Sequence, residues 1–292
     1  MDESPAIDTS LQVYEIYAIA LFIGGIAALI FVLKNWRKWV SLRRAPAAWK
    51  LSWIDFSLFV WAIICIALFA APLGQRLMGY LPGGDGSVEE NMGLFIICSG
   101  AIMQGGFIAF FAFWHFEKRT APLETRQLGL SQVFGYAVVI LLAAFPTVNL
   151  ATFGWTLLLE WLSSLGLPTA PEAQDSVIIF TESREEPVIF FGMMIVAAFL
   201  APIGEELVFR GGIFRYLLRH VRPVTAAIIS SLLFGALHIS LYGIVPLSLL
   251  GLVLCFAYYT TGSIRVPIAI HIAFNLHTIL IVWFFPEAAA GL

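Results

Sequence analysis

The sequence predicts an all-α, polytopic membrane protein: a helical bundle with about eight transmembrane helices around an intramembrane polar cavity. Composition is the first reason, because 60 % of the 292 residues are hydrophobic and only 12 % are charged, against about 25 % charged residues in soluble domains. The second is a series of apolar runs close to the ~20 residues that a helix needs to span a bilayer. The third is a small set of polar side chains at helical spacing inside the later runs.

The apolar runs follow one another with short polar connections. A helix is expected in each, because a helix satisfies its own backbone hydrogen bonds in lipid. About four spans fall in residues 1–187 and about four in residues 188–292, as parts of one continuous membrane domain. Pro146 and Gly154 are expected to kink the fourth span or to separate an interfacial helix from it. The expected spans cover residues 13–33, 54–71, 92–116, 132–150, 188–209, 224–241, 244–260 and 266–285.

The basic residues predict how the chain crosses the membrane. With the N-terminus outside, the loops on the cytoplasmic side hold 14 of the 16 Lys and Arg residues, in agreement with the positive-inside rule. We therefore expect a multi-pass protein of the plasma (inner) membrane, with both termini outside and an active site toward the cytoplasm. The first ten residues are acidic, so no cleavable signal peptide is expected. The cytoplasmic loops would be residues 34–53, 117–131, 210–223 and 261–265.

The first of these loops is basic and carries Trp36, Trp39 and Trp49 between its Lys and Arg residues. Such a mixture could indicate a nucleic-acid site, but beside a membrane helix it is typical of an interfacial anchor. The expected partner of this loop is therefore the lipid bilayer, and not nucleic acid. The cysteines all fall inside apolar runs, which predicts neither a disulfide framework nor a CxxC metal site.

Two adjacent carboxylates, Glu205 and Glu206, end the fifth apolar run in the stretch A-P-I-G-E-E-L-V-F-R. A charge at the bilayer centre costs roughly 2.5–3.5 kcal/mol on insertion scales, so the pair indicates a polar cavity, a partner or chemistry. The alternative is that the pair lies just past the helix end, in water. Glu206 and Arg210 have the i,i+4 order that favours a helical ion pair. This pair would hold Glu206 in place while Glu205 does chemistry.

Few other polar side chains lie inside the later spans. His238 follows Phe234 by four residues in the sixth span, and His271 and Asn275 share one helix face in the eighth. His277 points away from that face. A lone intramembrane His is usually a helix–helix hydrogen-bonding group. Together with the two carboxylates, however, these groups suit the activation of water, with Glu and His moving protons or binding a metal and an amide donating to an oxyanion.

Three motifs in this order resemble those of the CPBP family of membrane proteases, which includes the Ras-converting CAAX prenyl endopeptidase of eukaryotes and the Abi-type proteins of bacteria. The resemblance covers residues 188–285, and the first four spans fit only as generic membrane helices. Each motif is short, and their ordered occurrence in membrane runs makes the resemblance specific. The motifs are E-E-x-x-x-R at Glu205, Glu206 and Arg210, F-x-x-x-H at Phe234 and His238, and H-x-x-x-N at His271 and Asn275.

The resemblance implies an intramembrane endopeptidase that hydrolyses a peptide bond of a membrane-associated substrate, such as a prenylated CAAX-type protein. By the same resemblance, Glu205 with His238 would activate water, and His271 with Asn275 would stabilise the oxyanion. Glu206, Arg210 and Phe234 would support them. A divalent metal such as zinc stays open as a cofactor: Glu205, His238 and His271 are candidate ligands, and no H-E-x-x-H motif is present.

Other functions remain as alternatives. A serine or aspartyl intramembrane protease is disfavoured, because no span carries G-x-S-x-G and the P-G-G-D-G stretch at 82–86 does not read G-x-G-D. A non-proteolytic scaffold or a transporter could keep the same fold, although no internal repeat of the kind common in transporters is visible. One geometric conflict also arises. His238 is expected deep in its span and Glu205 near the cytoplasmic end, so either the sixth helix starts earlier or the glutamates lie deeper.

Overall fold

The computed structural model describes residues 5–35, 37–38, 45–118, 121–169 and 175–286, and every regular element in these ranges is helical. The predicted all-α membrane bundle is therefore confirmed. The helices are α1 (Pro5–Lys34), α3 (Trp53–Met78), α4 (Met92–Glu117), α5 (Leu130–Ser164), α6 (Asp175–Glu182), α7 (Pro187–Ile195), α8 (Ala201–Glu206), α9 (Arg215–Leu217), α10 (Pro223–Ala236), α11 (Ile244–Thr261) and α12 (Arg265–Phe284).

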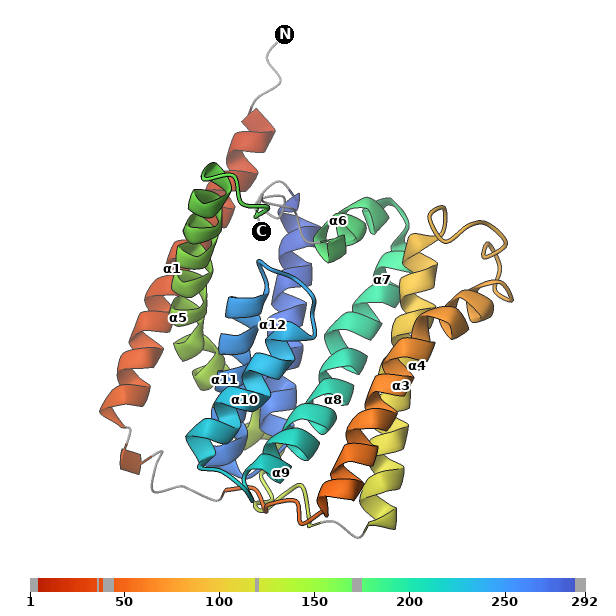
Figure 1. The fold of residues 1–292 in the computed structure, drawn as a ribbon. Helices are drawn as coiled ribbons and strands as arrows, with labels where there is room; N and C mark the ends of the chain where they lie inside the picture. Colours follow the sequence, from red (N-terminus) through yellow and green to blue (C-terminus); the bar gives the residue numbers. More distant parts are fainter. Residues whose placement is uncertain (1–4, 36, 39–44, 119–120, 170–174, 287–292) are drawn as a thin grey trace.

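The helices form three neighbouring groups (Figure 1). On one side α1 packs along α5, and on the other side α3 packs against α4. Between them lie α7–α9, the α10–α11 hairpin and α12, with α12 in contact with both α5 and α8. α6 lies near the end of the bundle at which α12 ends. The middle group therefore has helices on both sides, and it carries the motif residues.

Seven helical stretches in the described part of the chain are long and apolar enough to cross a membrane, with α7 to α9 counted as one stretch. The expected sixth span is different, because α10 ends at Ala236 after 14 residues. It is followed by a turn in which Ile239 has a φ of 51°, a left-handed conformation that a β-branched residue rarely adopts. The count of eight full spans is thus not confirmed. α10 still packs against α11, and the chain reverses direction between them (Figure 1), so the later helices keep their expected directions.

The fifth span is longer than predicted: the helical stretch runs from Pro187 to Leu217 over 31 residues. Two segments of it, Val196–Leu200 and Leu207–Phe214, are wide π-helical turns. Pro202 has no N–H to give the regular helical ladder, which is a local reason for an irregular turn before it. π-Turns often occur at functional sites, so their position on both sides of the glutamates indicates a functional site there.

This length corrects the predicted place of the carboxylates, which do not lie at a helix end. Along the helix axis, Glu205 lies about 18 Å from Leu217, where the helical stretch ends. α10 extends about 21 Å along its own axis from its first residue, Pro223, and His238 follows its last turn. Both lengths start from the same end of the bundle (Figure 1). The structure therefore brings Glu205 and His238 to similar depth and removes the conflict noted above.

The four loops expected on the cytoplasmic side meet at that same end of the bundle. Arg215, which the sequence places in a basic loop, is instead fully buried. Its guanidinium donates to the carbonyl of Ala47 at 2.7 Å and to that of Ala121 at 2.6 Å. The backbone N–H of Thr125 reaches the carbonyl of Gly262 at 2.9 Å. Arg215 thus joins three loops, which agrees with the predicted alternation of the spans.

Two further expectations concern Pro146 and the tryptophans. α5 is one helix through Pro146, so the expected separate interfacial helix does not form, and the alternative, a kink in the span, stays a prediction. Trp49 is not an interfacial anchor, because it is fully buried and its ring meets the edge of Phe59 at 4.9 Å between centroids. The other two tryptophans of the predicted anchor, Trp36 and Trp39, lie outside the described residues.

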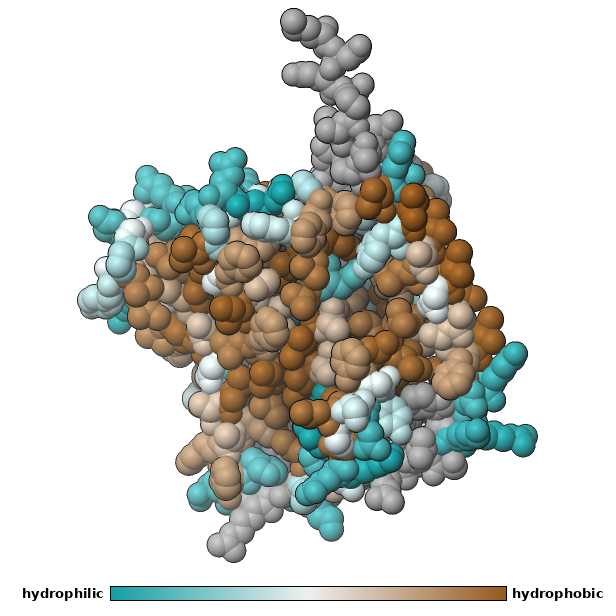
Figure 2. All heavy atoms as spheres, turned by 180° about the vertical axis from the view of Figure 1, so that it is seen from behind, coloured by the Kyte–Doolittle hydropathy of each residue, from teal (hydrophilic) through white to brown (hydrophobic). Residues whose placement is uncertain are grey.

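The surface is that of a protein embedded in lipid. Figure 2 shows hydrophobic atoms over the middle of one face, with hydrophilic atoms gathered toward its two ends. Large apolar side chains point outward along the helices, for example Ile16 at 69 % exposure on α1 and Leu68 at 69 % on α3. Exposed apolar area of this extent marks contact with a membrane or a partner, and the series of long apolar helices identifies the membrane. This is an integral multi-pass membrane protein.

Candidate active site

Glu206 is the buried centre of an ionic network. Its side chain has no exposed area, and its Oε1 accepts hydrogen bonds from Arg210 Nη1 at 2.8 Å and from His271 Nδ1 at 3.0 Å. Arg210 also donates from Nη2 to the carbonyl of Gly251 on α11, at 3.1 Å. The i,i+4 ion pair that the sequence predicts is therefore present. It is tied to α11 and α12, and Glu206 is closed off from reactants.

Phe234 supports this network from α10. Its ring lies under the Arg210 guanidinium, with 4.6 Å between the guanidinium carbon and the ring centroid. Phe209 meets the same ring edge-on at 5.2 Å. A guanidinium over an aromatic face is attracted by the ring's quadrupole, and more strongly where water is excluded. Arg210 is thus neutralised by Glu206 and packed on an aromatic side chain, which makes a buried charge tolerable.

His271 links the buried carboxylate to the reachable one. Glu206 Oε1 already accepts from an arginine, so the His271 Nδ1 is its second donor and carries the proton. The other ring nitrogen, Nε2, then faces Glu205 Oε2 at 3.9 Å. That distance is too long for a direct hydrogen bond, and one water can contact both atoms. The Glu205 side chain is 15 % exposed and that of Glu206 is 0 %, so only Glu205 is reachable.

Gln104 is a site residue that the sequence reasoning missed. It lies on α4, is only 2 % exposed, and donates from Nε2 to Glu205 Oε1 at 3.1 Å. The sequence did contain a signal for it, because a glutamine in the middle of an apolar run is, like an intramembrane carboxylate, a candidate functional residue. α4 is therefore more than a generic membrane helix.

His238 is near this network and not joined to it. It lies just beyond α10 and is exposed, and its Nδ1 is 2.8 Å from the carbonyl of Phe234. Among the contacts of the described residues, none links His238 to either glutamate by a hydrogen bond. The imidazoles of His238 and His271 both contact the Phe234 ring, at 4.9 Å and 5.6 Å between centroids. In this structure the imidazole next to Glu205 is therefore that of His271, and the predicted role of His238 in activating water stays a prediction.

Asn275 lies one turn beyond His271 and donates from Nδ2 to the carbonyl of Ala197 at 2.9 Å. Ala197 belongs to the first π-helical segment, where the backbone hydrogen bonds depart from the regular α-helical spacing. Asn275 therefore ties α12 to that irregular turn, and among the described residues its amide makes no hydrogen bond to Glu205 or Glu206. His277 packs against the rings of Tyr17 and Phe145, as its expected structural place requires.

The candidate metal ligands do not come together as a set. Glu205 and His271 are neighbours, but in the part of the chain that the structure describes no three His, Cys, Asp or Glu side chains gather as a metal-binding group.

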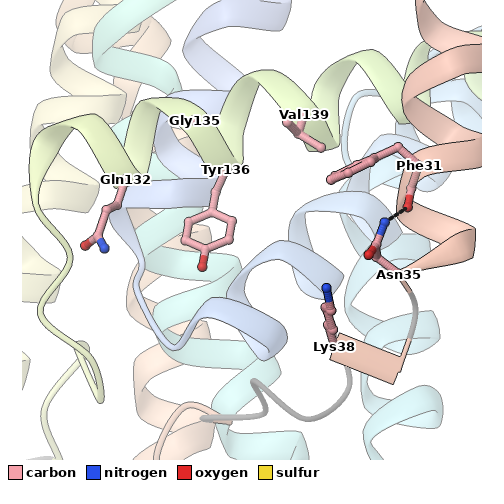
Figure 3. Close-up of a pocket in the computed structure, with 7 residues that line it drawn as sticks. All are labelled: Phe31, Asn35, Lys38, Gln132, Gly135, Tyr136 and Val139. Atoms are coloured by element: carbon pink, nitrogen blue, oxygen red, sulfur yellow. Dashed lines mark hydrogen bonds between the residues drawn. The ribbon is translucent and has the colours of Figure 1, made fainter.

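A cavity of about 490 Å³ lies away from these residues, where α1 and the start of α5 meet. Figure 3 shows Tyr136 of α5 and Lys38, beyond the end of α1, pointing toward the space between the two segments. None of the motif residues lines it. The cavity is therefore separate from the candidate active site.

Comparison with known proteins bears on the segment that holds the network. Residues 187–277 match the family model described as type II CAAX prenyl endopeptidase Rce1-like, and this range includes all the motif residues. The chain is also 29 % identical over 219 residues to the putative membrane peptidase YdiL of Bacillus subtilis (strain 168), a match that covers 73 % of this chain and 82 % of that protein. No solved structure matches the chain.

Proposed function

We propose, from the premise that residues 187–277 belong to the CPBP family of membrane proteases, that this protein is an intramembrane endopeptidase of the glutamate-dependent type. The observation that carries the proposal is that two adjacent carboxylates differ in their burial and in their contacts. Glu206 is sealed and held by Arg210 and His271, whereas Glu205 is 15 % exposed and faces the free nitrogen of the same imidazole. A structural ion pair needs only the first of these features.

In the proposed reaction a water molecule lies between Glu205 Oε2 and His271 Nε2. Glu205 takes a proton from this water as general base, and the oxygen adds to the carbonyl carbon of the scissile peptide bond. The protonated Glu205 then gives its proton to the leaving nitrogen as the C–N bond breaks, so that a carboxylic acid and an amine are released. Glu206 holds His271 so that Nε2 faces the water.

His238 is proposed to act on the substrate side. Its Nδ1–H is held by the Phe234 carbonyl, and this bond also stabilises an imidazolium. Protonated His238 can donate from Nε2 to the developing oxyanion. His238 is exposed beyond the end of a short helix, so a peptide can reach it. Asn275, expected to share this task, is proposed instead to hold the first π-helical segment beside Glu205.

The substrate class follows from the family description. The matching model is that of a CAAX prenyl endopeptidase, so a membrane-tethered peptide with a prenylated CAAX-type C-terminus is the first substrate to test. The Bacillus relative is named only as a putative membrane peptidase. Unprenylated membrane-tethered peptides are therefore the second class.

The purified protein in proteoliposomes is expected to cleave such a peptide, and the His238→Gln variant is expected to lose about 10²-fold or more in kcat. Its thermal unfolding midpoint should stay close to that of the wild type, because the side chain is exposed. Cleavage is measured by mass spectrometry, with and without added divalent metal. A wild-type protein that cleaves neither substrate class under either condition would favour the scaffold or transporter alternative, and full activity of the variant would remove His238 from the mechanism.

A further inference from the structure

We infer that Gln104 on α4 is the positioning residue that holds the carboxylate of Glu205 in its reactive orientation. This rests on the proposed function and deepens it. Gln104 lies outside the segment that matches the family model, so the active site would be completed by a helix from the other part of the chain.

The amide of Gln104 is buried. Gln104 is 2 % exposed in the middle of an apolar helix, where a polar side chain is disfavoured unless it is paired. Its Nε2 donates to Glu205 Oε1 at 3.1 Å, but its Oε1 is buried without a hydrogen-bond partner in the described structure. Among the described residues, the side-chain hydrogen bond of this buried amide therefore goes to Glu205.

The amide of Gln104 is oriented with its nitrogen toward Glu205. An ionised carboxylate only accepts hydrogen bonds, so the nitrogen of Gln104, and not its oxygen, must face Glu205. One carboxylate oxygen, Oε1, is then held by Gln104, and the other, Oε2, is left beside His271 Nε2. The hydrogen bond from Gln104 thus restricts the rotation of the carboxylate and leaves Oε2 free to contact a water. The oxygen that is left is the one that the proposed mechanism uses as the base.

Gly204, the residue before the glutamates, leaves space for this amide. A Cβ at Gly204 would lie 2.5 Å from Gln104 Oε1 and 3.2 Å from the backbone carbonyl oxygen of Gln104. Any larger residue at 204 would therefore displace the amide or separate α4 from α8. The glycine and the glutamine form one fitted contact between these two helices.

The rival explanation is that Gln104 is a helix–helix tether without a catalytic consequence. The two explanations differ in what a variant changes. Loss of a tether lowers the unfolding midpoint and leaves turnover by the folded protein unchanged. Loss of a positioning bond lowers kcat and leaves KM unchanged, because an amide that is 2 % exposed offers a peptide almost no contact surface.

The test uses the full-length protein in proteoliposomes with the membrane-tethered peptide. Gln104→Met keeps the length of the side chain and removes its N–H donor, and we expect kcat to fall about 10- to 100-fold at unchanged KM. Gln104→Glu keeps the shape and can donate only when the introduced carboxyl is protonated, so its kcat relative to the wild type should recover as the pH is lowered. Gly204→Ala should reproduce the loss by displacing the amide. Ser99→Ala on the same helix, whose hydroxyl bonds only to carbonyls of its own helix, is the control and should retain wild-type kcat.

The outcomes separate the two proposals. If the wild type cleaves no peptide, the proposed function fails. If the wild type cleaves, Glu205→Gln does not, and Gln104→Met and Gly204→Ala both keep wild-type kcat, the role of Gln104 is wrong and the protease assignment stands. A fall in the unfolding midpoint of Gln104→Met with unchanged kcat would also overturn the inference, in favour of the tether.

Discussion

Replacement of Glu205 by glutamine is expected to lower kcat by about 10²- to 10⁴-fold, the range typical of the loss of a general base, while the helical bundle stays folded. The amide has the size of the carboxylate but cannot take a proton from water. Glu205 is also the half of the pair that is partly exposed and lies outside the Arg210 ion pair. Single-turnover cleavage of the tethered peptide measures the change directly, because product release does not limit it.

Glu206→Gln is the matched control for this prediction, because it makes the same chemical change one residue along the helix. It removes the acceptor of both Arg210 and His271, so we expect a lower unfolding midpoint together with reduced activity. A Glu205→Gln protein that turned over peptide at the wild-type rate would show that Glu205 is not the base. A protein that lost its fold with either substitution would show that the two carboxylates do not divide their roles.

Replacement of Arg210 by methionine is expected to destabilise the protein by about 3–5 kcal/mol, the effect of leaving a buried charge without its partner. Methionine fills much of the space and removes the guanidinium. Glu206 then keeps only His271, and the Gly251 carbonyl loses its donor. The unfolding midpoint in detergent micelles, followed by tryptophan fluorescence, measures the loss.

A double variant separates the charge from the packing. Arg210→Met combined with Glu206→Gln removes both charges of the buried pair, so it should recover a large part of the stability lost in Arg210→Met alone. Lys118→Met provides the comparison for an ion pair at the surface, because Lys118 and Asp55 are both about one-third exposed. It should scarcely change the midpoint. Equal effects of the buried and the surface variant would contradict the network described here.

The length of α10 illustrates what hydropathy does not determine. The apolar run continues past Ala236 through Leu237 and Ile239, so composition alone predicts a full span to residue 241. The helix ends at Ala236, and the chain then turns toward α11. In this connection the carbonyl of Leu241 accepts a hydrogen bond from Trp155 Nε1 of α5, which is far away in the sequence.

The amino-acid pattern was enough to predict the all-helical membrane class and the gathering of the basic loops at one end of the bundle. It also predicted the Glu206–Arg210 pair, because helical periodicity makes residues i and i+4 neighbours. Only the packing of the helices shows which carboxylate is buried, that His271 lies beside Glu205, and that Gln104 reaches Glu205 from α4. These contacts join residues 65 to 101 positions apart. They depend on how each helix is rotated about its own axis and packed against its neighbours. The residue pattern of a single helix holds no information about the rotation of the helix beside it.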